Sequence, residues 1–119
     1  MCVVVVDDEP EMLGLISDVL ESEGHETVGF ETPVAVIDAE EELDGEPDLF
    51  LLDLMLPQMD GIALAARLAR DGFADTPKVA ISASNDKLRA ARASQLFAAT
   101  ISKPFDIVEL LNCVDKYLS

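Results

Sequence analysis

The chain has 119 residues, half of them apolar, and a formal net charge of −16 at pH 7. This length predicts one domain over residues 1–119, because it allows a single buried core. The 24 acidic residues against 8 basic ones argue against direct nucleic-acid binding, since a phosphate backbone would be repelled. Such acidity is typical either of a protein from a salt-rich host or of ordinary solubility charge.

The apolar runs predict no membrane contact. Val3–Val6 and Leu49–Leu52 are far shorter than the ~18 residues of a membrane span. The first residues lack the basic flank and the long apolar stretch of a secretory signal, so we expect a cytoplasmic protein. Cys2 and Cys113 lie in apolar patterns without a CxxC spacing, and we expect both to be reduced and buried.

The first part of the chain alternates strand and helix patterns. The β-branched run Cys2–Val6 predicts an interior strand, and apolar residues at three- and four-residue steps predict a helix that begins at Pro10 and is stopped by Gly24. A short strand is expected at Glu26–Phe30, followed by a helix from Pro33 with Thr32 as its cap. The residues that this helix is expected to turn inward are Val34, Ile37 and Leu43.

A buried strand that ends in a carboxylate lies in the middle of the sequence. Four apolar residues, Leu49–Leu52, precede Asp53, and only a strand terminus could bring this carboxylate out of an apolar sheet. Pro57 and the pair Asp60-Gly61 predict a turn before the next helix. The segment after Asp53 is therefore expected to be a fixed loop.

The second part of the chain repeats this alternation, and five alternations in all predict a parallel sheet with helices on both faces. The helix expected over residues 86–96 is rich in Ala and Arg and has few large apolar side chains, so it should be the least firmly docked. The elements expected here are the helix Gly61–Asp71, the strand Lys78–Ser82, the helix 86–96, the strand Ala99–Ser102 and a last helix behind a capping box of Asp106 and Glu109.

Polar side chains follow four of the expected strands. In sheets of this kind, ligands bind beyond the carboxyl ends of the strands. The residues before these positions are nearly all apolar, so one shared site explains the pattern better than four separate caps, turns or solvated strand ends. The residues concerned are Asp7 and Asp8, Asp53, Ser82 and Lys103.

This set of side chains suits phosphoryl transfer. Three carboxylates at one edge repel one another, so at least one pKa should rise unless a cation is present. Mg²⁺ meets this need, because it prefers oxygen ligands and is held by one or two carboxylates. A carboxylate beside Mg²⁺, a lysine and a hydroxyl can accept a phosphoryl group, and the product would be an aspartyl phosphate.

These motifs resemble the receiver domain of two-component response regulators over essentially the whole chain. The resemblance rests on Asp7-Asp8, on Asp53 within PDLFLLDLMLPQMDG, on Ser82-Ala83 and on Lys103-Pro104-Phe105. It implies an α/β, flavodoxin-like (βα)5 three-layer sandwich with a parallel five-stranded sheet of order 2-1-3-4-5. It also implies a signalling domain that assists its own phosphotransfer and dephosphorylation, and not an enzyme in the usual sense.

The same resemblance implies roles for single residues. Asp53 would be phosphorylated by a histidine kinase or a phosphotransfer protein. Asp8 and Asp53 would ligate Mg²⁺ directly, with the Met55 carbonyl as the third protein ligand and Asp7 acting mostly through water. The implied partner on the output side is a downstream effector protein or an output domain outside this chain, and the implied state is a monomer or weak homodimer. The residues implied to bind the phosphoryl oxygens are Ser82 and Lys103.

The chain departs from the family at Thr100. Receivers usually carry Tyr or Phe three residues before the lysine, and that ring turns inward on phosphorylation. Threonine has far less apolar area to bury than a large side chain, whose burial is worth ~1.5–3 kcal/mol. We therefore expect weaker coupling between phosphorylation and the last strand and helix. Phe97, the nearest aromatic residue, lies three positions too early.

Three other functions share parts of the pattern. A flavin-binding electron-transfer protein would need a phosphate-binding loop of Ser, Thr and Gly after the first strand, where this chain has Asp7-Asp8-Glu9. A phosphatase with an aspartate nucleophile would usually show Asp-x-Asp on the first strand and a lid insertion. A receiver-like interaction scaffold that is never phosphorylated stays open, as does the choice between a stand-alone protein and a piece of a longer regulator.

Overall fold

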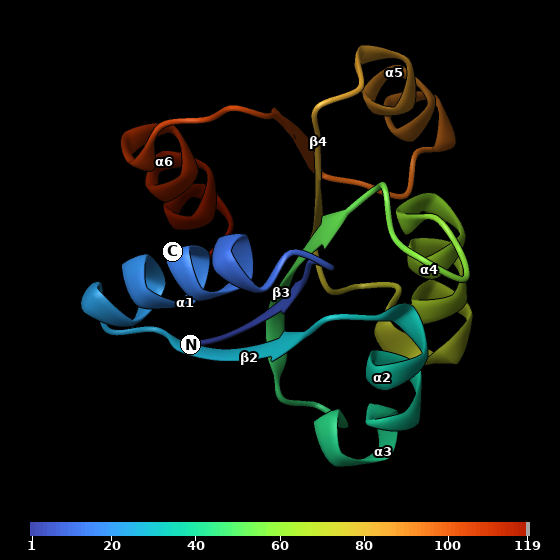
Figure 1. Cartoon of the computed structure of the whole chain (residues 1–119). Coiled ribbons are helices and arrows are strands. Elements are labelled where there is room, and N and C mark those ends of the chain that lie inside the picture. Colours follow the sequence, from blue (N-terminus) through green and yellow to red (C-terminus); the bar gives the residue numbers. More distant parts are fainter. Residues whose placement is uncertain (119) are drawn as a thin grey trace.

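Five parallel strands form one sheet in the order β2-β1-β3-β4-β5 in the computed structural model, which describes residues 1–118. Each strand lies where the sequence predicts it, except that β3 begins two residues earlier, at Pro47. Figure 1 shows the strands crossing the centre of the molecule. They are β1 (Cys2–Val6), β2 (Glu26–Phe30), β3 (Pro47–Asp53), β4 (Lys78–Ser82) and β5 (Ala99–Ser102).

Helices cover both faces of the sheet (Figure 1). α1 (Pro10–Ser22) and α6 (Ile107–Leu118) pack on one face, in a buried cluster shared with β1, β3, β4 and β5. The remaining helices pack on the other face. This arrangement confirms the flavodoxin-like three-layer fold. The helices of the second face are α2 (Pro33–Asp38), α3 (Glu40–Leu43), α4 (Gly61–Leu68), the π-helical turn η1 (Ala69–Phe73) and α5 (Asn85–Ser94).

The central strand β1 is buried on both faces. Its residues Val3 to Val6 are at most 1% exposed. Because side chains alternate along a strand, Val3 and Val5 join the α1 and α6 cluster, whereas Val4 and Val6 join the cluster of α2 and α4. A strand in the centre of the sheet therefore requires an uninterrupted apolar run. The first polar residue after β1, Asp7, lies at the carboxyl edge of the sheet.

The helix expected from Pro33 is in fact two short helices. α2 begins at Pro33, with the Thr32 hydroxyl accepting a hydrogen bond in its first turn, but the chain breaks before α3, from which Leu43 reaches the core as predicted. The prediction that Val34 points inward is wrong, because its side chain is 43% exposed while Val36 is fully buried. Val36 lies one helical turn after Pro33 and shares its buried face, which leaves Val34 on the solvent side.

Other helices differ from the prediction at their ends. α4 stops at Leu68 and continues as η1, and the chain leaves the helical conformation at Gly72, whose φ is 114°. α5 spans 85–94 and ends at Gln95 in a left-handed conformation. At the start of α6, Ile107 and Val108 are 48% and 65% exposed. Within the described part of the chain, no helix is both long and apolar enough to cross a membrane.

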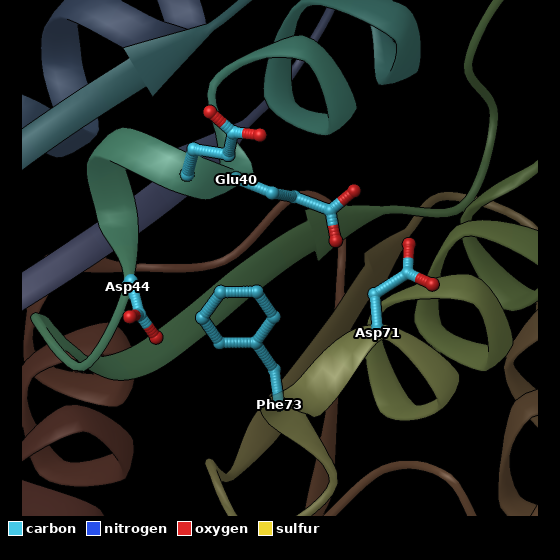
Figure 2. Close-up of a pocket in the computed structure, with 5 residues that line it drawn as sticks. Glu40, Asp44, Asp71 and Phe73 are labelled. Atoms are coloured by element: carbon cyan, nitrogen blue, oxygen red, sulfur yellow. The ribbon is translucent and has the colours of Figure 1, made fainter.

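Acidic side chains line a hollow where α3 meets η1. Figure 2 shows the Glu40 carboxylate reaching toward Asp71 beside the Phe73 ring. Glu40 Oε2 is buried and has no hydrogen-bond partner among the described residues. Burial, then the hydrogen bond to Asp71 and its negative charge, raise the pKa of Glu40 to about 7. Asp71 is held ionised by the Arg67 guanidinium, whose Nε lies 2.7 Å from its carboxylate and lowers its pKa.

This contact predicts a pH-dependent effect of Glu40→Gln. The folded chain keeps the Glu40 proton up to about pH 7, whereas the unfolded chain loses it near the ordinary glutamate pKa of 4.5. Stability from this group is therefore lost as the pH rises through that interval. Because glutamine imitates the protonated acid, we expect the variant to be more stable than wild type by about 1 kcal/mol at pH 8. Urea unfolding followed by circular dichroism measures the difference, which should shrink toward zero by pH 5.

The matched control is Glu41→Gln, on the next and exposed residue of α3. It should show no such trend with pH. A gain for Glu40→Gln that is the same at pH 5 and pH 8 would contradict the raised pKa of Glu40.

Candidate functional site

The carboxyl edge of the sheet brings together side chains from separate strands. Asp7 follows β1, Asp53 ends β3, Ser82 ends β4 and Lys103 follows β5. The strand register keeps these ends level, since Asp53 pairs with Ile81 and Ser82 pairs with Ser102. The structure confirms the prediction that these residues lie together at one edge of the sheet.

Lys103 links two of the carboxylates. Its Nζ lies 3.2 Å from Asp7 Oδ2 and 3.1 Å from Asp53 Oδ2, and 3.8 Å from Glu9 Oε1. The side chains of Asp7 and Asp53 are 2% and 5% exposed, and that of Lys103 is 13% exposed. These are buried charges in direct contact, which interact far more strongly than a surface ion pair.

Backbone N–H groups hold the other oxygens of the same two carboxylates. The Glu9 N–H donates to Asp7 Oδ1 at 2.9 Å, and the Met55 N–H donates to Asp53 Oδ1 at 2.9 Å. Each aspartate is therefore fixed on one side by the loop that follows it and on the other side by Lys103. This fixes the orientation of both carboxylates before any ligand binds.

Three carboxylates converge closely enough to hold a cation. Asp7, Asp8 and Asp53 each offer an oxygen within 4.8 Å of the others. Asp8 is exposed, unlike its two neighbours. Carboxylate oxygens are the donors that hard divalent cations such as Mg²⁺ prefer. The donor set therefore fits the predicted metal.

The electrostatics of the site are set by burial and by Lys103. Burial raises the pKa of Asp7, the Asp53 charge adds to the rise, and the Glu9 N–H and Lys103 oppose it. One pKa in the cluster is raised even with Lys103 in contact, and its main cause is burial and not the repulsion from which the rise was predicted. Burial alone would lower the pKa of Lys103, but the hydrogen bonds and charges of Asp53 and Asp7 outweigh it and raise that pKa.

A hollow of about 250 Å³ opens over this cluster. Ser82 is not part of its lining: the residue is fully buried, and its Oγ accepts a hydrogen bond from the Ser84 N–H at 3.0 Å. Ser84 in turn caps α5. The Ser82 hydroxyl therefore lies at the edge of the site and supports the first turn of α5. The residues that line the hollow are Asp8, Glu9, Asp53, Met55, Ala83 and Lys103.

Thr100 makes a side-chain contact that its place in the sequence does not predict. Its Oγ1 accepts a hydrogen bond from Arg92 Nη1 at 2.9 Å, which ties β5 to the last turn of α5. No sequence motif predicts the hydrogen bond between Arg92 and Thr100, because it depends on how α5 lies along the edge strand β5. Phe97 packs against the clusters under α4 and α5.

The sequence matches the family model of the response regulator receiver domain over residues 3–115. The chain belongs to this family. It is therefore a receiver domain of the kind found in two-component signalling, and the resemblance noted from its motifs is confirmed.

Relatives of this receiver differ in length. It is 30% identical to sporulation initiation phosphotransferase F of Bacillus subtilis, with 98% of this chain and 92% of that protein covered. It is 36% identical to the phosphate regulon transcriptional regulatory protein PhoB of Pseudomonas aeruginosa, where 92% of this chain but only 48% of that protein is covered. The chain thus spans about half the length of some of the curated relatives that it matches.

A solved receiver shares the fold closely. The response regulator TrrA of Thermotoga maritima, in complex with Mg²⁺ and a beryllofluoride, superposes with a TM-score of 0.85 at 26% identity, and 98% of each chain is covered.

The buried bridge predicts a pH-dependent loss of stability in Lys103→Met. Without the ammonium group, Asp7 and Asp53 are buried beside each other with no compensating charge, and breaking such a pair costs about 3–5 kcal/mol. The loss should be largest near pH 8. It should be smaller at pH 5, because Asp7, whose folded-state pKa is already raised, can then take up a proton. Urea unfolding in the presence of a chelator of divalent cations measures both values.

The control is Lys116→Met, which removes an exposed lysine from α6. Its effect should stay within about 0.5 kcal/mol at either pH. An equal loss for Lys103→Met at both pH values would show that charge compensation is not what Lys103 supplies.

Proposed function

We propose that this receiver accepts a phosphoryl group on Asp53, from a histidine kinase or a phosphotransfer protein, with the help of Mg²⁺. The observation that carries the proposal is the buried Asp53 carboxylate, which lines the hollow together with Lys103 and Asp8. A nucleophilic carboxylate, an ammonium group and a set of metal-binding oxygens are the groups that phosphoryl transfer needs.

The chain offers suitable ligands for the metal. Asp8 and Asp53 would hold Mg²⁺ directly, with the Met55 carbonyl beside them and Asp7 acting through water. This assignment is supported by the lining of the hollow, which includes Asp8, Asp53 and Met55 but not Asp7. When bound, the ion would offset negative charge on the carboxylates and on the incoming phosphoryl group.

The transfer itself needs only one new bond at the protein. A carboxylate oxygen of Asp53 attacks phosphorus, the O–P bond forms, and the N–P bond of the phosphohistidine donor breaks with its electron pair going to the imidazole nitrogen. Lys103, already in contact with Asp53 at 3.1 Å, offsets charge on the transferred group. The Ser82 hydroxyl only accepts from the Ser84 N–H, so its own proton is free for a phosphoryl oxygen. Because Ser82 is buried behind the lining of the hollow, this contact would require the hydroxyl to turn toward the transferred group.

The partners follow from the same proposal. The relatives include a protein of nearly this length and regulators about twice as long, so the output partner is either a separate effector protein or an output domain joined to this chain. A receiver-like scaffold without phosphorylation is the alternative, and the intact set of Asp53, Lys103 and Asp8 at one hollow favours the phosphoacceptor.

Phosphorylation should depend on both Mg²⁺ and Asp53. We expect the wild-type chain to gain the mass of one phosphoryl group when it is incubated with acetyl phosphate and Mg²⁺, as measured by intact-protein mass spectrometry. Asp53→Asn should gain none, because an amide oxygen is too poor a nucleophile. A gain of mass by the variant equal to that of wild type would refute Asp53 as the acceptor, and no gain by wild type with any donor would refute the function.

Asp8 and Asp7 should differ in their effect on Mg²⁺ affinity. Direct ligation contributes more than a contact through water, so Asp8→Ala should weaken binding more than Asp7→Ala, by about tenfold or more. Amide chemical shifts recorded during a Mg²⁺ titration give both dissociation constants. Equal losses in the two variants would show that the ranking is wrong.

A further inference from the structure

The first residue of α4 lies against the backbone of the phosphoacceptor. The Gly61 N–H donates to the Leu54 carbonyl at 3.1 Å and closes the loop that follows β3. Asp60 caps the same helix, with its Oδ1 accepting from the Ala63 N–H at 2.8 Å. The residue after Asp53 and the start of α4 are therefore in direct contact.

Gly61 has no space for a side chain. A Cβ atom at this position would lie 2.4 Å from the Asp53 carbonyl oxygen and 2.8 Å from Leu54 Cα. Both are backbone atoms, so no rotation of a side chain could relieve the overlap. Gly61 is not among the glycines with positive φ, so the requirement for glycine here comes from close approach and not from backbone conformation.

The elements on either side of this contact resist movement. β3 is paired on both sides, with β1 and β4, and its last residues are buried. α4 is held by Leu64, Ala65 and Leu68, all fully buried. Any added volume at residue 61 must therefore be accommodated in the Asp53–Leu54 peptide or the loop behind it.

We propose that Gly61 is a positioning residue for the phosphoacceptor site: by letting α4 close on the Asp53–Leu54 peptide, it fixes the Asp53 carboxylate and the Met55 backbone. This inference rests on the proposed function. The link to the carboxylate is the Met55 N–H, which donates to Asp53 Oδ1 at 2.9 Å, so a tilted peptide displaces both groups together. Displacements of about 1 Å at a reacting group can cost 10²-fold in rate.

The test is Gly61→Ala, measured by Mg²⁺ titration of amide shifts and by the rate of phosphorylation with acetyl phosphate. We expect the Mg²⁺ dissociation constant to rise and the rate constant to fall, each by about tenfold or more. The matched control is Gly14→Ala in α1, where a Cβ would meet nothing within 4 Å. It should change both quantities by no more than about twofold.

A second control separates positioning from loss of stability. Val36→Ala removes fully buried methyl groups from α2, outside the loop that follows β3, and lowers stability. Folded Val36→Ala should keep Mg²⁺ affinity and phosphorylation rate near those of wild type. Equal losses in Val36→Ala and Gly61→Ala would overturn the proposal, as would wild-type values in Gly61→Ala.

Failure of the proposed function gives a different result, since the wild-type chain itself would then bind no Mg²⁺ and gain no phosphoryl mass. If Gly61→Ala does not fold in buffer, the measurements are repeated in trimethylamine N-oxide, which favours compact states. A variant that stays unfolded there would overturn the positioning role, because Gly61 would then be required for the fold itself.

Discussion

The contact of one ammonium group with two buried carboxylates organises the functional edge of this receiver. Asp7 and Asp53 end central strands whose preceding residues are almost entirely apolar, so both carboxylates are withdrawn from water. Buried carboxylates need compensation, and Lys103 supplies it from 96 and 50 residues away in the sequence. The negative charge of Asp7 and Asp53 is therefore partly compensated only when β1, β3 and β5 have all taken their places in the sheet.

The helix α5 is joined to this edge by hydrogen bonds at both ends and by a small apolar cluster. Only Leu88 and Ala91 of α5 are buried, in agreement with its composition of alanines and arginines. At its start, Ser84 caps the helix and donates its N–H to Ser82. Near its end, Arg92 donates to Thr100 on β5. These hydrogen bonds connect the two ends of α5 to β4 and β5.

The helix on the other side of the site is held differently. α4 begins at Gly61, in contact with the peptide after Asp53, and three of its residues are fully buried. Its continuation η1 reaches the acidic hollow, where Asp71 meets Glu40 of α3 (Figure 2). On one side of the site, α4 is placed by steric contact and three fully buried residues, and on the other side, α5 is placed by hydrogen bonds and two buried residues.

The sequence by itself determined where the strands lie and which residues follow them at the carboxyl edge of the sheet. This was possible because a strand buried on both faces must be a continuous apolar run, and the polar residue that ends it is then conspicuous, as with Val3–Val6 before Asp7. The order of the strands in the sheet came from the resemblance to the receiver family. The ends of the helices could not be predicted as well. The break after α2 and the burial of Val36 depend on packing against β1 and α4, and a local sequence pattern carries no information about that packing.

Only the tertiary structure decided which atoms touch. Lys103 bridges Asp7 and Asp53, Arg92 reaches Thr100, and Gly61 lies against the Asp53 carbonyl. All three contacts depend on how strands, helices and loops lie against one another in the fold. The raised pKa of Glu40 has the same origin, since burial and the approach of Asp71 from another helix cause it. Composition and spacing specify which side chains are available, but burial and contact set their charge and orientation.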